Sequence, residues 1–208
     1  MSKKKIAING FGRIGRLVFR AYIERVKEFN ETYEIAYIND LADIDSNIHL
    51  LNYDSVHGAL KQEVKKTADN KFLVGDNEIT VTSERNPIDL NWGDKGVDVI
   101  LECTGVFASK EKAMSHIESG AKKVIVSAPC TNADFTVVQG VNHQELSNDH
   151  VVISNASCTT NCLSPVAYVI DKEFGIERSS TELSFAELSF AGLTSAELDP
   201  AGLSSAEL

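Results

Sequence analysis

The glycine-rich turn near the start of the chain constrains the fold more than any other feature. A short expected strand, residues 4–8, leads directly into N-G-F-G-R-I-G at residues 9–15. Apolar residues then recur at helical spacing, starting with Ile14, Leu17 and Val18. A strand, a G-x-G-x-x-G turn and a helix in this order are typical of a domain that binds a dinucleotide.

Each glycine of the motif has its own task in such a turn. Gly10 allows the tight bend, Gly12 lets a pyrophosphate approach the backbone, and Gly15 lets the helix pack on the strand. The other positions of the motif are Asn9, Phe11, Arg13 and Ile14. The alternative reading is a glycine turn that merely shapes the chain.

An acidic residue follows the second expected strand. Residues 33–39 are expected to form a strand with an apolar centre, 35–38, and this strand ends directly before Asp40. A carboxylate at this place can accept the ribose hydroxyls of adenosine, and its charge opposes the additional phosphate of NADP. The sequence therefore predicts NAD as the cofactor.

Strands and helices alternate along the rest of the chain. We expect a helix at 44–52, a loop at 53–58, a hairpin of strands 71–74 and 78–82, a strand at 97–101, a helix from Ser109 to about 119, and strands at 122–127 and 151–153. This pattern predicts an α/β fold with a Rossmann-type, doubly wound, mostly parallel sheet. Ligands of such sheets bind at the carboxyl ends of the strands, where Asp40, Thr104, Ser127 and Cys158 fall.

A cysteine is expected where the last strand turns into a helix. It belongs to S-N-A-S-C-T-T-N-C-L at residues 154–163. The free amides and the dipole of a helix start should stabilise a thiolate at Cys158, which is therefore a candidate nucleophile. A buried, inert cysteine is the alternative, and Cys162, one turn later, is expected to pack in the core. We expect no metal site, and we expect His150 at the opposite end of the sheet from Cys158.

Composition excludes some classes of function. The chain has 208 residues, 43% of them hydrophobic, which is enough for one domain with a core. Its net charge of −10 argues against a general affinity for nucleic acid or an anionic membrane. No segment is apolar enough for a signal peptide or a membrane span, and the four scattered cysteines are expected to be reduced thiols. These features predict a cytoplasmic protein.

Taken in order, these motifs and S-E-R-N-P, E-C-T-G-V-F and S-A-P resemble the glyceraldehyde-3-phosphate dehydrogenase family from about residue 4 to residue 178. The resemblance implies a glycolytic oxidoreductase that takes an aldehyde phosphate, inorganic phosphate and NAD. It implies that Cys158 attacks the aldehyde and that Ser157 and Thr159 flank the substrate. The cofactor-binding positions that it implies are Asn9, Gly10, Phe11, Gly12, Arg13, Ile14, Gly15, Asp40, Arg85, Thr104, Gly105 and Ser127. Erythrose-4-phosphate dehydrogenases share most of these motifs, so the aldehyde stays open.

The sequence departs from the family pattern after Arg178. We expect residues 1–178 to form the NAD-binding domain, including the cysteine helix, and residues 179–208 to form a separate tail. Leucine recurs every five residues from Leu183 to Leu208, a spacing that resembles the pentapeptide-repeat family; a disordered low-complexity tail is the alternative. The general-base histidine and the phosphate-binding arginine of the family have no counterpart. We therefore expect impaired catalysis and a doubtful tetramer, and a non-catalytic nucleotide-binding or interaction protein remains a second reading.

Overall fold

A computed structural model describes residues 3–29 and 32–176, so the expected tail at 179–208 lies outside the described residues. The first half contains β1 (Lys4–Asn9), α1 (Arg13–Glu24), α2 (Val26–Phe29), β2 (Tyr33–Asn39), α3 (Ile44–Asn52), β3 (Tyr53–Asp54), β4 (Gly58–Ala59), β5 (Val64–Ala68), β6 (Lys71–Val74) and β7 (Asn77–Thr82). The second half contains the 3₁₀ helix η1 (Pro87–Leu90), β8 (Val99–Glu102), α4 (Lys110–Glu118), β9 (Lys123–Val126), β10 (Phe135–Thr136), the 3₁₀ helix η2 (His143–Glu145), β11 (Val152–Ser154) and α5 (Cys158–Phe174).

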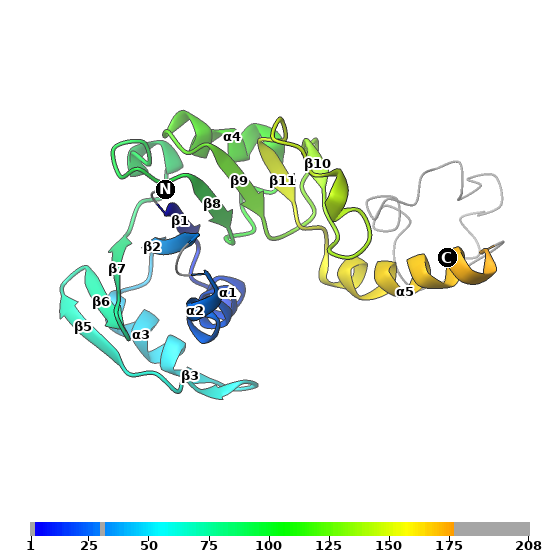
Figure 1. Cartoon of the computed structure of the whole chain (residues 1–208). Helices are drawn as coiled ribbons and strands as arrows, with labels where there is room; N and C mark the ends of the chain where they lie inside the picture. The colour runs from blue at the N-terminus through cyan, green and yellow to red at the C-terminus, as the bar shows by residue number, and fades with distance from the viewer. Residues whose placement is uncertain (1–2, 30–31, 177–208) are drawn as a thin grey trace, which may run out of the picture.

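Within the described residues, nine strands form one sheet in the order β10-β11-β9-β8-β1-β2-β7-β6-β5 (Figure 1). All neighbours from β10 to β7 are parallel, whereas β7, β6 and β5 form an antiparallel meander. Strands β7, β2, β1, β8, β9 and β11 stand in the 3-2-1-4-5-6 order of doubly wound dinucleotide-binding folds. The expected α/β, Rossmann-type fold is confirmed.

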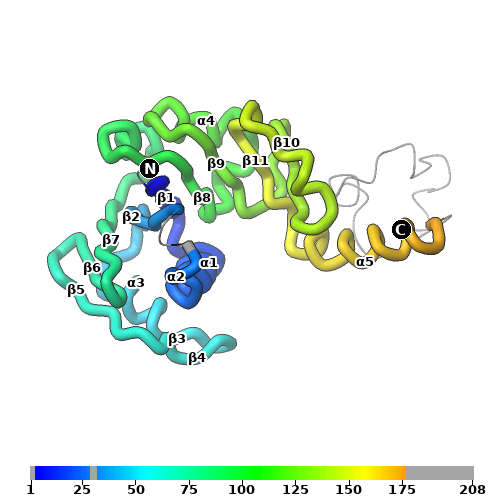
Figure 2. The backbone as a smooth tube through the Cα atoms, in the orientation of Figure 1, coloured from blue at the N-terminus to red at the C-terminus, as the bar shows by residue number. Residues whose placement is uncertain are grey.

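The core is divided between the two faces of this sheet. One cluster contains Ile8 and Phe19 and packs β1 and β2 against α1 and α3. The other contains Ala7 and Trp92 and packs the sheet against α4 and the segment around η1. Because Ala7 and Ile8 are neighbours in β1, they point to opposite faces. The tube trace shows α1 and α4 on opposite sides of β1 and β8 (Figure 2).

Helix α5 leaves this body instead of lying on the sheet. It extends away from β11 (Figure 1), and the side chains of Val166, Val169 and Phe174 are exposed. The apolar helical pattern that predicted this helix therefore does not mark a face buried on the sheet. The expectation that Cys162 packs in the core is wrong, because Cys162 is exposed on α5.

The sequence located most elements but missed short strands. Helix α3 has its expected bounds, Ser109 caps α4 as expected, and the expected hairpin is β6–β7 with β7 starting at Asn77. The segment 53–58, expected as a loop, begins with β3, which pairs with β4 in a separate two-stranded sheet. Strands β5 and β10 were not expected.

Candidate functional site

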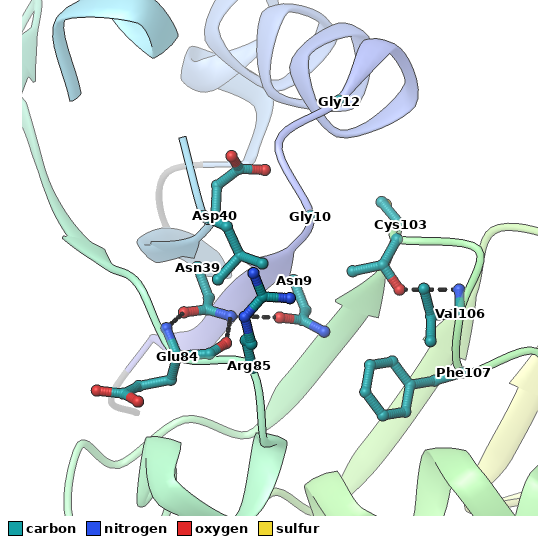
Figure 3. Close-up of a pocket in the computed structure, with 12 residues that line it drawn as sticks. Asn9, Gly10, Gly12, Asn39, Asp40, Glu84, Arg85, Cys103, Val106 and Phe107 are labelled. Carbon is teal, nitrogen blue, oxygen red and sulfur yellow. Dashed lines mark hydrogen bonds between the residues drawn. The ribbon is translucent and has the colours of Figure 1, made fainter. Parts of the chain in front are cut away.

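A pocket of about 380 Å³ opens at the carboxyl ends of β1, β2 and β8 (Figure 3). Six of the residues expected to bind a cofactor line it: Asn9, Gly10, Gly12, Asp40, Arg85 and Thr104. The remaining lining residues are Asn39, Leu41, Glu84, Cys103, Val106 and Phe107. Its volume lies within the range of about 300–1,000 Å³ that is usual for small-molecule sites.

The glycine turn places open space in front of a helix start. Gly10 has a φ of +92°, and a Cβ there would lie 2.8 Å from the Thr104 backbone nitrogen. A Cβ on Gly15 would collide with the Gly10 carbonyl oxygen, whereas a Cβ on Gly12 would meet no atom within 4 Å. Gly12 is the N-cap of α1, and no side chain caps this helix. The backbone N–H groups in the first turn of α1 therefore have no capping side chain, and the space in front of them is open. Such N–H groups suit an anionic diphosphate.

Asp40 holds the glycine turn as well as lining the pocket. Its Oδ2 accepts a hydrogen bond from the Phe11 backbone N–H at 2.6 Å, and its Oδ1 accepts one from the Ala42 N–H at 2.9 Å. The Phe11 side chain is buried and packs edge to face against Phe19. Phe11 therefore contributes its backbone to the site, whereas its ring belongs to the core.

Two expected cofactor contacts of α1 point elsewhere. The Arg13 guanidinium forms an ion pair with Asp54, with Nη1 3.5 Å from Oδ2, and the Ile14 side chain is exposed. Neither side chain lines the pocket. Because both residues lie in the first turn of α1, their backbone N–H groups are the groups that can face a ligand.

The loop after β8 forms one wall of the pocket. Thr104 and Cys103 line it, and Gly105 follows with a φ of +74°. Burial raises the pKa of the Cys103 thiol to about 11, although a hydrogen bond with Ser127 acts in the opposite direction. Cys103 is thus a protonated wall residue at neutral pH, and Ser127 reaches the pocket wall through it.

Cys158 lies at the first turn of α5, exposed to solvent. Ser157 is the N-cap, and its Oγ accepts a hydrogen bond from the Thr160 N–H at 3.0 Å and lies 2.9 Å from the Thr159 hydroxyl. Ala156 precedes the cap in a left-handed conformation with a φ of +56°. A non-glycine residue with this backbone is strained, which is common where a loop aims a reactive group.

Backbone hydrogen bonds join the strand ends into one edge. Gly10 N–H donates to the Asn39 carbonyl, and Cys103 N–H donates to the Asn9 carbonyl. Ser127 N–H donates to the Glu102 carbonyl, and Asn155 N–H to the Val126 carbonyl. Asp40 therefore follows the end of β2, and Cys158 follows the end of β11, four strands away. At about 4.8 Å per strand, the edge between them is about 19 Å long.

His150 lies at the opposite end of the sheet from Cys158, as expected, and His116 is buried in the core. His150 stacks on Phe135, and its carbonyl accepts from Lys123 at the start of β9, which is the opposite end of the sheet. His116 is buried between β8 and α4. Within the described residues, no hydrogen bond or ion pair links a histidine to Cys158.

Sequence reasoning missed several residues of the pocket. Asn39 and Glu84 line it, and Glu102 lies buried beneath it. Asn39 and Glu102 are the last residues of their strands. A polar residue that ends a buried apolar strand is a signal that could have pointed to them.

Two family models match this chain. Residues 4–110 match the NAD-binding domain of glyceraldehyde 3-phosphate dehydrogenase, and residues 157–183 match the C-terminal domain of the same enzyme. The second match begins at Ser157, beside Cys158.

Curated relatives give the same result. The glyceraldehyde-3-phosphate dehydrogenase of Xanthobacter flavus is 53% identical over 174 residues, which are 84% of this chain and 51% of the relative. The enzyme of Geobacillus stearothermophilus is 51% identical over 175 residues, covering 84% of this chain and 50% of the relative. The chain thus spans about half the length of the curated relatives it matches. Among residues 3–29 and 32–176, no helix is both long and apolar enough to cross a membrane.

Proposed function

Because the chain belongs to the glyceraldehyde-3-phosphate dehydrogenase family, we propose that it supplies the cofactor site and the nucleophile of a phosphorylating aldehyde dehydrogenase. The observation that carries this proposal is the single sheet edge that holds the glycine turn, the cofactor pocket and the start of α5. A hydride transfer needs a cofactor and a reacting carbon side by side, and the shared sheet edge supports such an arrangement.

NAD is the cofactor of this domain, because the matched family model is an NAD-binding domain. The first turn of α1, from Gly12 to Gly15, would hold its diphosphate through backbone amides. Asp40 would accept from the adenosine ribose, and Arg85 would lie along the same half of the pocket. Thr104, Gly105 and Ser127 would face the part of the cofactor nearer to Cys158.

Cys158 would carry the covalent chemistry. Its thiolate adds to the aldehyde carbon and gives a hemithioacetal, whose anionic oxygen the first-turn amides of α5 can stabilise. NAD, when bound, accepts the hydride that leaves this carbon. Inorganic phosphate then cleaves the resulting thioester, which releases an acyl phosphate and restores the thiolate. Ser157 and Thr159 would flank the substrate, and the helix start would favour the anionic sulfur.

The remaining parts of the proposal concern the whole protein. We propose an aldehyde phosphate and inorganic phosphate as substrates, in glycolysis. A cytoplasmic location is supported by the four cysteines, all free thiols. We also place the end of the cofactor domain at residue 178, after α5, and a repeat-like unit at 179–208, on the sequence pattern described above.

The proposal is tested by cofactor binding to the 208-residue chain. Calorimetry should show tighter binding of NAD than of NADP, by about tenfold or more, because Asp40 would face the added phosphate. Asp40→Ala should reduce this preference. Asp76→Ala, which removes an exposed carboxylate of the β6–β7 turn, should leave it unchanged.

Two results would count against the proposal. Absence of NAD binding to the wild-type chain would remove the cofactor site altogether. Equal affinities for NAD and NADP would remove Asp40 from it, while leaving the glycine turn as the binding element.

A further inference from the structure

A buried carboxylate lies under the cofactor pocket and is not part of its lining. Glu102 ends β8 and is 1% exposed, yet it accepts four hydrogen bonds. Its Oε2 accepts from Asn9 Nδ2 at 2.6 Å and from His116 Nε2 at 2.9 Å. Its Oε1 accepts from the Thr104 backbone N–H at 2.8 Å and from the Thr104 hydroxyl at 2.5 Å. A carboxylate offers about four acceptor positions, so Glu102 is fully used.

The tautomer of His116 follows from its other neighbour. Trp92 Nε1 lies 3.1 Å from His116 Nδ1, and an indole N–H can only donate. His116 Nδ1 must therefore accept, which leaves the proton on Nε2, directed at Glu102. The imidazole is neutral, and a chain of hydrogen bonds runs in one direction from Trp92 through His116 to Glu102.

A second chain reaches Glu102 from the pocket side. The Glu84 backbone N–H donates to Asn39 Oδ1 at 2.9 Å, and Asn39 Nδ2 donates to Asn9 Oδ1 at 2.7 Å. Asn9 Nδ2 then donates to Glu102, as described above. Figure 3 shows the Asn39 amide between Glu84 and Asn9. This chain joins the carboxyl ends of β2, β1 and β8 and the segment that follows β7.

Resting on the NAD-binding function proposed above, we propose that Glu102, held by His116 and Trp92, is a positioning residue for the cofactor. Glu102 does not itself line the pocket, but it accepts hydrogen bonds from the Asn9 amide and the Thr104 backbone N–H. Through Asn9 it also orients the Asn39 amide, and all three of these residues line the pocket. The Thr104 hydroxyl also accepts from the Val106 N–H at 3.1 Å, so the loop after β8 is fixed by the same carboxylate.

Both chains of hydrogen bonds end with donors directed at Glu102, so a side chain that only accepts is needed at this position. A glutamine at position 102 would present an amide NH₂ either to Thr104, which donates twice, or to Asn9 and His116, which both donate. Shifting the His116 proton to Nδ1 would set it against the Trp92 indole N–H. A buried donor without an acceptor is costly, so the pocket residues must move to relieve the conflict.

The test compares Glu102→Gln with Val124→Ala, which removes buried side-chain volume from the same core cluster outside the network. We expect the folded Glu102→Gln chain to bind NAD about tenfold or more weakly and to exchange its Thr104 amide proton faster. Val124→Ala should lower the unfolding temperature and keep the wild-type affinity. Trp92→Phe, which removes the indole donor and also some buried ring volume, should weaken NAD binding by about two- to fivefold relative to Val124→Ala, which controls for lost core volume.

The outcomes separate the two proposals. A folded Glu102→Gln chain with wild-type NAD affinity and unchanged Thr104 exchange would overturn the positioning role, leaving a network that only joins strands. If Glu102→Gln does not fold, Trp92→Phe decides by the same two measurements. A wild-type chain that fails to bind NAD would overturn the proposed function itself, a result that is visible before any variant is compared.

Discussion

Replacing Gly12 with aspartate should stabilise the protein and abolish its cofactor binding. Gly12 is the N-cap of α1 with a φ of −67° and a ψ of −161°, a conformation open to any residue, and a Cβ there would meet no atom within 4 Å. An aspartate at this position can accept a hydrogen bond from the first-turn amides, which no side chain now caps. The fold therefore has room for the substitution, whereas a diphosphate would compete for the same amides.

The two effects have opposite signs and can be estimated separately. A capping carboxylate at a helix start contributes about 0.5–1.5 kcal/mol through its hydrogen bond and the helix dipole. For a chain of this size, such a gain raises the unfolding temperature by about 1–5 °C. A fixed negative charge about 4 Å from a diphosphate costs about 4 kcal/mol at an effective dielectric constant of 20, or about a thousandfold in affinity.

Thermal unfolding without ligand and calorimetry with NAD measure the two effects on the same samples. Gly12→Ser is the matched variant, because serine also caps but adds no charge; it should keep the gain in stability and lose less affinity than the aspartate. NAD affinity within threefold of wild type in Gly12→Asp would refute the placement of the diphosphate at α1. A fall in the unfolding temperature would show that the turn needs glycine for its backbone and not for the ligand.

Two further predictions concern the thiols and the carboxylates. Iodoacetamide should alkylate Cys158 and Cys162, which are exposed, while Cys130, which is buried, and Cys103, with a pKa raised to about 11 by burial, stay unmodified at pH 7 in mass spectra; early labelling of Cys103 would contradict the wall position assigned to it. Asp98 accepts hydrogen bonds from Lys122 and from the Lys5 backbone N–H, and these lower the pKa of its carboxyl group. The stability that Asp98 contributes to the fold is therefore complete above its unfolded pKa near 4. It is lost as the pH falls through the lower pKa of the folded state. Asp98→Asn should thus reduce the free energy of unfolding by about 1–2 kcal/mol at pH 7 and by progressively less as the pH falls below the unfolded pKa of Asp98, and a loss that stays constant with pH in urea unfolding would contradict this.

The glycine turn and the helix caps could be predicted because they depend on residues that are close together in the sequence. The glycine turn depends on the positive φ of Gly10 and on the close approach of Gly15 to the Gly10 carbonyl oxygen, and both involve only neighbouring residues of the chain. The N-caps at Ser109 and Ser157 follow from short hydroxyl side chains placed directly before helices. Such features are visible without knowing how the strands pair.

The solvent exposure of the side chains on α5 could not be predicted in the same way. The apolar spacing on α5 predicted a helix correctly but gave no information on what its apolar side would contact, and Val166, Val169 and Phe174 are exposed. The expected burial of Cys162 rested on the usual preference of free cysteine for the core, which likewise gives no information on what α5 contacts. Periodicity fixes the shape of a segment, whereas burial depends on neighbours that are distant in sequence.

The polar network under the pocket depends on strand order and register together. Asn9 faces Asn39 on one side and Glu102 on the other because β1 lies between β2 and β8 and pairs Asn9 with both. A shift of one residue in either pairing would turn one of these side chains to the other face of the sheet. Each residue alone is only a polar strand end in the sequence, a position with many uses. The pairing turns them into one directed set of hydrogen bonds, and this is why the residues that shape the cofactor site became visible only once the sheet was assembled.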